Sequence, residues 1–126
     1  MNESPEPTLG NTRLAAERAR LANHAAYNAP GSDMDNLYDR TGAVHELLSC
    51  TEQLVRVLGE QVQRIAKAEG LRSTDDTTPA ARQALRAARL LMAGSLHVRR
   101  ACDEVNEAWS ALSPLYIDAP DEGGAS

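Results

Sequence analysis

The sequence predicts an all-α fold: a long antiparallel helical hairpin preceded by a short N-terminal helix, in three-helix up-and-down order. In two long segments of similar length, apolar residues recur at alternating spacings of four and three, as on one face of a helix. Eight mostly polar residues (71–78) separate these segments, which is typical of antiparallel neighbours. Aromatic residues make up only 3% of the chain and Phe is absent, which argues against a β-sandwich or barrel.

The length of 126 residues suits one domain, which we expect over residues 12–117. Residues 1–11 and 118–126 are rich in Pro, Glu, Gly and Ser without periodicity, so we expect them to be disordered tails. The first helix is predicted over residues 12–27. Leu14 and Leu21 are its only large aliphatic residues, so we expect it to pack peripherally.

The second helix is predicted over residues 33–70. Ser32 is the expected N-cap, Asp35 completes an acidic version of the capping box, and Gly70 is the expected C′ residue. Leu47 and Leu54 widen its apolar stripe on one side. The stripe predicted to face the next helix consists of Met34, Leu37, Thr41, Val44, Leu48, Thr51, Val55, Leu58, Val62 and Ile65.

The third helix is predicted over residues 79–113, with Thr78 as N-cap and Pro79 at the first position. Its apolar series is equally regular and ends close to Pro114. The series consists of Ala81, Ala84, Ala88, Leu91, Ser95, Val98, Cys102, Val105, Trp109 and Leu112.

One flank of the third helix carries a small residue at every seventh position, which favours close approach of a partner helix. The high helix propensity of alanine is the alternative explanation. Three large apolar residues also lie off the main series, so this helix is predicted to bury two faces and to form a four-helix-type bundle by dimerisation. The predicted interface is Ala80, Ala87, Leu90, Met92, Gly94, Leu96, Ala101 and Ala108.

Two histidines and two cysteines fall in one layer of the predicted hairpin: His45, Cys50, His97 and Cys102. These residue types bind zinc or form redox-active thiol pairs. A spacing of five residues, however, places the His and Cys of each helix about 140° apart around its axis, whereas ligands on one face are three or four residues apart. We therefore expect no metal and no cofactor, with Cys102 as a small buried residue.

Charge is distributed unevenly along the predicted hairpin. Arg82, Arg86 and Arg89 open the third helix, where the helix dipole disfavours cations, and they form a possible binding face for an acidic partner. A solvated face is the alternative. The net charge of −5 and the lack of interleaved aromatic residues argue against nucleic acid as a partner.

Tyr38, Trp109 and Tyr116 are expected at the open end of the hairpin, where they could line a small-molecule pocket. The alternative is an aromatic plug that closes the core, in which the Trp109 indole needs a hydrogen-bond acceptor.

The sequence lacks phosphate-binding loops, nucleophile elbows and Glu-x-x-His motifs, so we expect a protein that is not an enzyme. Its predicted function is protein–protein association, as a homodimer or as an adaptor for another protein. A small-molecule-binding regulatory module at Trp109 and a thiol or metal site are the alternatives. We expect a cytoplasmic protein with no membrane segment, and the scarcity of lysine and abundance of alanine are typical of a GC-rich bacterial genome.

Overall fold

The computed structural model describes residues 6–28 and 33–118, and these are all-helical: 80% of them lie in three α-helices, with no strands. The helices are α1 (Pro7–Asn28), α2 (Met34–Ile65) and α3 (Ala80–Leu112). The chain divides after Asp33 into two units, one holding α1 and the other holding α2 and α3. The predicted N-cap at Ser32 lies outside the described residues.

Helix α1 begins at Pro7, so residues 7–11, predicted as part of a tail, are helical. Glu6 explains the early start, because its carboxylate accepts hydrogen bonds from the backbone N–H groups of Thr8 (2.7 Å) and Leu9 (3.0 Å). These bonds also lower the pKa of the Glu6 carboxyl. Proline follows at the first helical position, where its missing N–H costs nothing.

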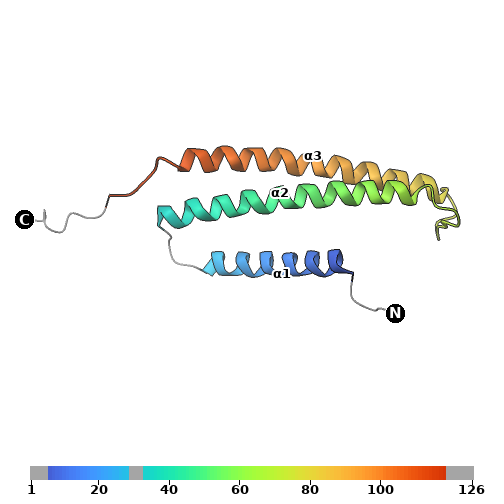
Figure 1. Ribbon diagram of the computed structural model, residues 1–126, viewed down its shortest axis with the longest axis horizontal. Helices are drawn as coiled ribbons and strands as arrows, with labels where there is room; N and C mark the ends of the chain where they lie inside the picture. The colour runs from blue at the N-terminus through green and yellow to red at the C-terminus, as the bar shows by residue number, and fades with distance from the viewer. Residues whose placement is uncertain (1–5, 29–32, 119–126) are drawn as a thin grey trace, which may run out of the picture. The chain divides into compact units, whose positions relative to one another are not determined.

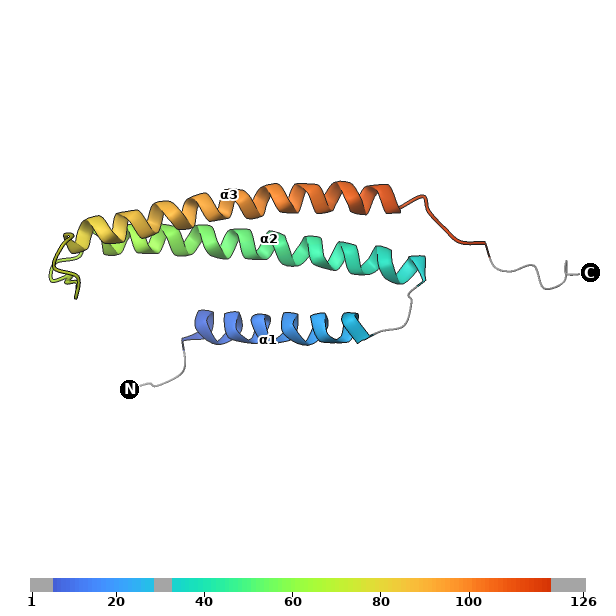
Figure 2. The same cartoon turned by 180° about the vertical axis from the view of Figure 1, so that it is seen from behind.

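Helices α2 and α3 pack side by side and antiparallel, as predicted, and Figures 1 and 2 show them joined at one end by the 66–79 segment. With 32 and 33 residues they are about 48–50 Å long. Helix α2 ends at Ile65, five residues before its predicted end. Two bonds from residue i to i−3 tighten the chain there, from Lys67 to Arg64 and from Ala68 to Ile65, and Gly70 takes its positive φ of 84° in the loop.

The start of α3 differs from the prediction by one residue. Pro79 occupies the capping position without a side-chain cap, and its carbonyl accepts the N–H of Gln83 at 3.1 Å. The Gln83 side chain holds the loop instead, donating to the Thr78 carbonyl (3.1 Å) and the Asp75 carboxylate (3.2 Å) and accepting from the Ser73 hydroxyl (2.8 Å).

The Asp75 carboxyl makes the stability of the loop depend on pH. The hydroxyl and backbone N–H of Thr77 donate to its carboxylate and lower its pKa. Because the pKa is lowered in the folded state, the contact stabilises the loop at pH values above the ordinary aspartate pKa. This stabilisation is lost as the pH falls through the lowered pKa. We expect the Thr77 amide resonance to titrate below the ordinary aspartate range in NMR. Thr77→Val should move that midpoint upward, and an unchanged midpoint would contradict the role of the hydroxyl.

The α3 side of the seam between the two helices agrees with the predicted series. Ala88, Ser95 and Cys102, seven residues apart, are buried, and except for exposed Ala81 the rest of the series is half-buried. Gly59 on α2 is the fourth buried residue among those described. All four are small, which allows a close approach of the two backbones.

The side of α2 that faces α3 is rotated from the predicted stripe, of which Val55 still adjoins Gly94 of α3. Tyr38, Gly42, His45, Ser49 and Gly59 contact α3, whereas part of the predicted stripe points outward. The physical reason is that Trp109 and Met92 on α3 need the space that the α2 glycines leave. A Cβ on Gly42 would lie 2.6 Å from Trp109 Cζ2, and one on Gly59 would lie 3.0 Å from Met92 Sδ. Four residues of the predicted stripe are exposed instead: Leu37, Val44, Leu58 and Ile65.

Candidate functional site

The most extensive candidate surface is an apolar face along the outer side of α2. Six large aliphatic side chains on it are 38–51% exposed. Their spacing keeps them on one side of the helix, turned away from the side that contacts α3. We call these residues the α2 outer face: Leu37, Val44, Leu47, Leu54, Leu58 and Ile65.

The small-residue flank of α3 borders this face. A Cβ on Gly94 would lie 3.9 Å from Val55 Cγ1, so Gly94 adjoins α2 three residues from Leu58. Val55 is half-buried and lies three residues before Leu58, so it connects the α2 outer face to the α3 flank of Ala87, Gly94, Ala101 and Ala108.

The predicted interface residues do not all share this surface. Gly94 and Leu90 are four residues apart and lie on one side of α3, with Leu90 59% exposed. Leu96 is two residues from Gly94, about 160° around the helix, and is 63% exposed on the opposite side. Met92 packs inside the hairpin against Gly59. Ala80, Gly94 and Ala101 are half-buried, and Ala87 and Ala108 are exposed.

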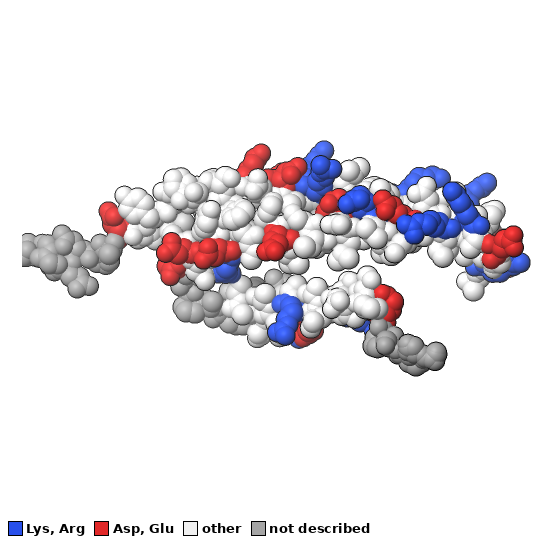
Figure 3. All heavy atoms as spheres, viewed as in Figure 1, with Lys and Arg blue, Asp and Glu red and all other residues white. Residues whose placement is uncertain are grey.

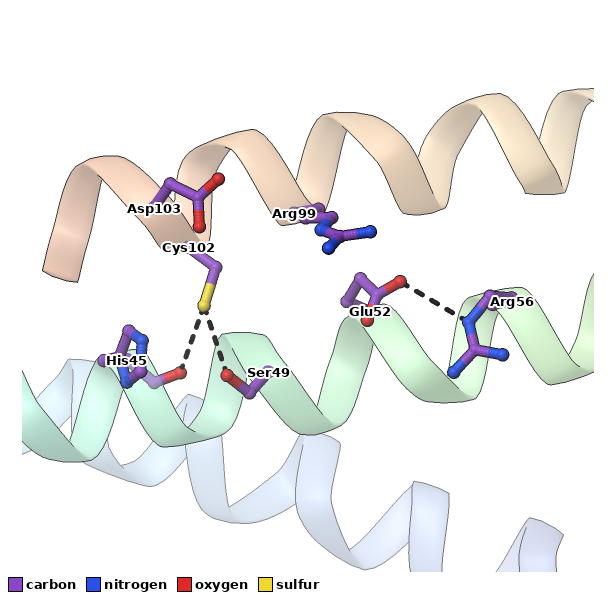
Figure 4. A pocket seen from close by; sticks show the side chains of 7 residues that line it. All are labelled: His45, Ser49, Glu52, Arg56, Arg99, Cys102 and Asp103. Carbon is purple, nitrogen blue, oxygen red and sulfur yellow. Dashed lines mark hydrogen bonds and ion pairs between the residues drawn. The ribbon is translucent and has the colours of Figure 1, made fainter.

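A polar cleft of about 390 Å³ lies between α2 and α3 where Cys102 meets α2 (Figure 4). The Cys102 thiol donates to the His45 carbonyl (3.7 Å) and shares a hydrogen bond with the Ser49 hydroxyl (3.2 Å). Arg56 forms ion pairs with Glu52 (3.6 Å) and Glu60 (3.9 Å). The cleft is open, and each helix lines it with one acidic and one basic side chain: Glu52 and Arg56 on α2, Asp103 and Arg99 on α3.

The His and Cys layer does not come together as one cluster. Cys102 is buried and His45 half-buried, but Cys50 and His97 are exposed, and both cysteines are free thiols. Across residues 6–28 and 33–118, no three histidine, cysteine, aspartate or glutamate residues lie close enough to hold a metal ion.

The aromatic residues of the open end are partly together. Trp109 lies 5.6 Å from the ring of Tyr38 and 5.7 Å from that of His45, measured between ring centroids. Tyr116 is not part of this cluster, because α3 ends at Leu112 and the Tyr116 side chain is 77% exposed. The Trp109 ring fills the space above Gly42, and its buried Nε1–H has no hydrogen-bond partner among the described residues.

Arg82, Arg86 and Arg89 are all exposed on the first three turns of α3. Figure 3 shows basic side chains concentrated toward the loop end of the hairpin, with acidic side chains more frequent toward its open end. The exposed basic residues of the loop end also include Arg64 and Lys67 on the α2 side. No contact of the described residues assigns this group a ligand, so the binding of an acidic partner by Arg82, Arg86 and Arg89 remains a prediction.

Comparison with protein-family models, with curated proteins and with solved structures gave no match. Of the described helices, none combines the length and the apolarity that crossing a membrane requires. The residues themselves therefore carry the functional argument. The sequence analysis missed the α2 outer face, although Leu47 and Leu54 beside the predicted stripe were a signal for it.

Proposed function

We propose that the protein acts through protein–protein association, by docking the α2 outer face and the adjoining small-residue flank of α3 on another helical surface, without catalysis. A second copy of the chain supplies such a surface, and two hairpins packed in this way form a four-helix bundle. The proposal locates the protein in the cytoplasm, where its free thiols stay reduced.

The observation that carries this proposal is that the hairpin buries small side chains and exposes large apolar ones. Its buried residues are Gly59, Ala88, Ser95 and Cys102, whereas the six large aliphatics of the α2 outer face are 38–51% exposed. A continuous row of large apolar side chains on a soluble helix typically marks an interaction surface. The regular spacing of the row suits the groove between two helices of a partner.

Light scattering coupled to size exclusion tests the proposal directly. We expect a mass near 27 kDa, twice the chain mass of 13.6 kDa. Leu54→Glu places a charge in the centre of the outer face, and it should raise the dissociation constant of the dimer at least about tenfold by disfavouring burial of that position.

Leu96→Glu is the matched control, since Leu96 is more exposed than Leu54 but lies on the other side of α3. It should leave the mass unchanged. Circular dichroism of both variants verifies that the helices persist. A wild-type mass of 13.6 kDa, or equal effects of the two variants, would contradict the proposed association.

A further inference from the structure

Four of the six residues of the α2 outer face are spaced symmetrically about a central position, and Leu47 and Leu54 lie four and three residues from it. Thr51 marks that centre, with Val44 and Leu58 seven residues to either side and Leu37 and Ile65 fourteen residues away. A second α2 laid antiparallel across this face therefore brings Leu37 of one copy to Ile65 of the other, and Val44 to Leu58. A twofold interface needs this kind of self-complementary pattern.

Thr51 itself is compatible with an apolar interface. Its hydroxyl donates to the Leu47 carbonyl at 2.8 Å, so the polar group is already satisfied within α2. A buried hydroxyl without a partner would cost free energy, whereas this one leaves its methyl group available for packing.

The charges at the two ends of α2 favour the same orientation. Asp35 and Asp39 lie in the first turns, and Arg64 and Lys67 lie at the other end; all four are exposed. Antiparallel pairing places the acidic start of one helix at the basic end of the other, whereas parallel pairing places like charges together. Asp39 and Arg64 are nearly equidistant from Thr51, at twelve and thirteen residues.

Helix α3 repeats this arrangement of charge. Arg86 lies toward the loop end and Glu107 toward the open end, at nearly equal distances from the middle of the helix, and both are exposed. Figure 3 shows the resulting difference in charge between the two ends of the hairpin. When two hairpins pack antiparallel, the basic loop end of each therefore meets the acidic open end of the other.

We infer that the partner of the α2 outer face is a second copy of the chain, held antiparallel by a twofold axis that passes near Thr51. This inference rests on the proposed function and adds the orientation of the two copies and the position of the twofold axis. It places the acidic start of α2 in each copy at the same height as the basic end of α2 in the other.

Cross-linking distinguishes the orientations. In a Cys50→Ser parent, which removes the exposed thiol and leaves the buried Cys102, we would prepare Leu37→Cys and Ile65→Cys as separate full-length proteins. A short bismaleimide should link neither variant to itself. After the two variants are mixed and re-equilibrated, about half of the dimers contain one copy of each. The bismaleimide should link the two copies in these mixed dimers.

Charge reversal provides a second test. Arg64→Glu reverses a charge at the basic end of α2 and weakens the attraction to the acidic end of the other copy, so the dissociation constant should rise in low salt and by less in high salt. Adding Asp39→Arg should restore it. Arg82→Glu is the control, because it makes the same change of charge on the Leu96 side of α3, away from the interface.

Efficient self-linking of each single variant would overturn the antiparallel arrangement while leaving the association intact. A dimeric mass without any cross-link in the mixture would do the same. A monomeric mass for the wild type would overturn the proposed association and the inference together, so the two failures are distinguishable.

Discussion

Ser95→Leu is expected to lower the free energy of unfolding of the hairpin by about 3 kcal/mol through overpacking. Ser95 is 1% exposed near the middle of α3, between the buried small residues Ala88 and Cys102 of the same seam. Its hydroxyl donates to the Met92 carbonyl at 2.7 Å, so it occupies little space and needs no partner on α2. A leucine at this position would force the helices apart.

Thermal unfolding followed by circular dichroism measures the effect, with an expected fall in Tm of about 15 °C for a unit of this size. Ala93→Leu is the control, since Ala93 is exposed two residues earlier on the same helix. It should change the stability by less than about 0.5 kcal/mol. A similar loss for both variants would show that the seam is not closely packed at Ser95.

Gly42→Ala is expected to destabilise the hairpin by about 2 kcal/mol, even though alanine is the better helix former by about 1 kcal/mol. The added Cβ would lie 2.6 Å from Cζ2 and 2.7 Å from Cε2 of Trp109. The indole is a rigid ring held between Tyr38 and His45, so it cannot give way as a flexible side chain would.

Urea unfolding followed by Trp109 emission measures this change at the residue that causes it. Gly94→Ala is the matched control, because its Cβ would lie 3.9 Å from Val55, an ordinary contact. It should stabilise the hairpin by about 0.5–1 kcal/mol through reduced backbone entropy of the unfolded chain. A stabilising Gly42→Ala would contradict the close contact with Trp109.

The side of α3 that faces α2 was predictable, because the apolar series of α3 marks the face that is buried. The side of α2 that faces α3 was not predictable, because two neighbouring faces of α2 both carry residues at regular helical spacing. The prediction chose the more apolar face, but Gly42, Ser49 and Gly59 supply the depth that Trp109, Cys102 and Met92 require. Regular spacing identifies the faces of a helix without stating which partner each one meets.

Only part of the candidate site was predictable from the sequence. Tyr38 and Trp109, both expected at the open end of the hairpin, have ring centroids 5.6 Å apart, but Tyr116 follows the end of α3 and is 77% exposed. The start of α1 was missed because a glutamate is an uncommon N-cap, and only its two short bonds to Thr8 and Leu9 reveal the role of Glu6.

The small size of the buried side chains has a thermodynamic consequence. The heat-capacity change of unfolding scales with the apolar surface that becomes exposed, and Gly59, Ala88, Ser95 and Cys102 contribute little of it. A single hairpin therefore has a shallow stability curve, whose maximum is broad and whose thermal transition extends over a wide temperature range. Covering the α2 outer face would bury further large apolar side chains, which raises the heat-capacity change of unfolding and sharpens that transition.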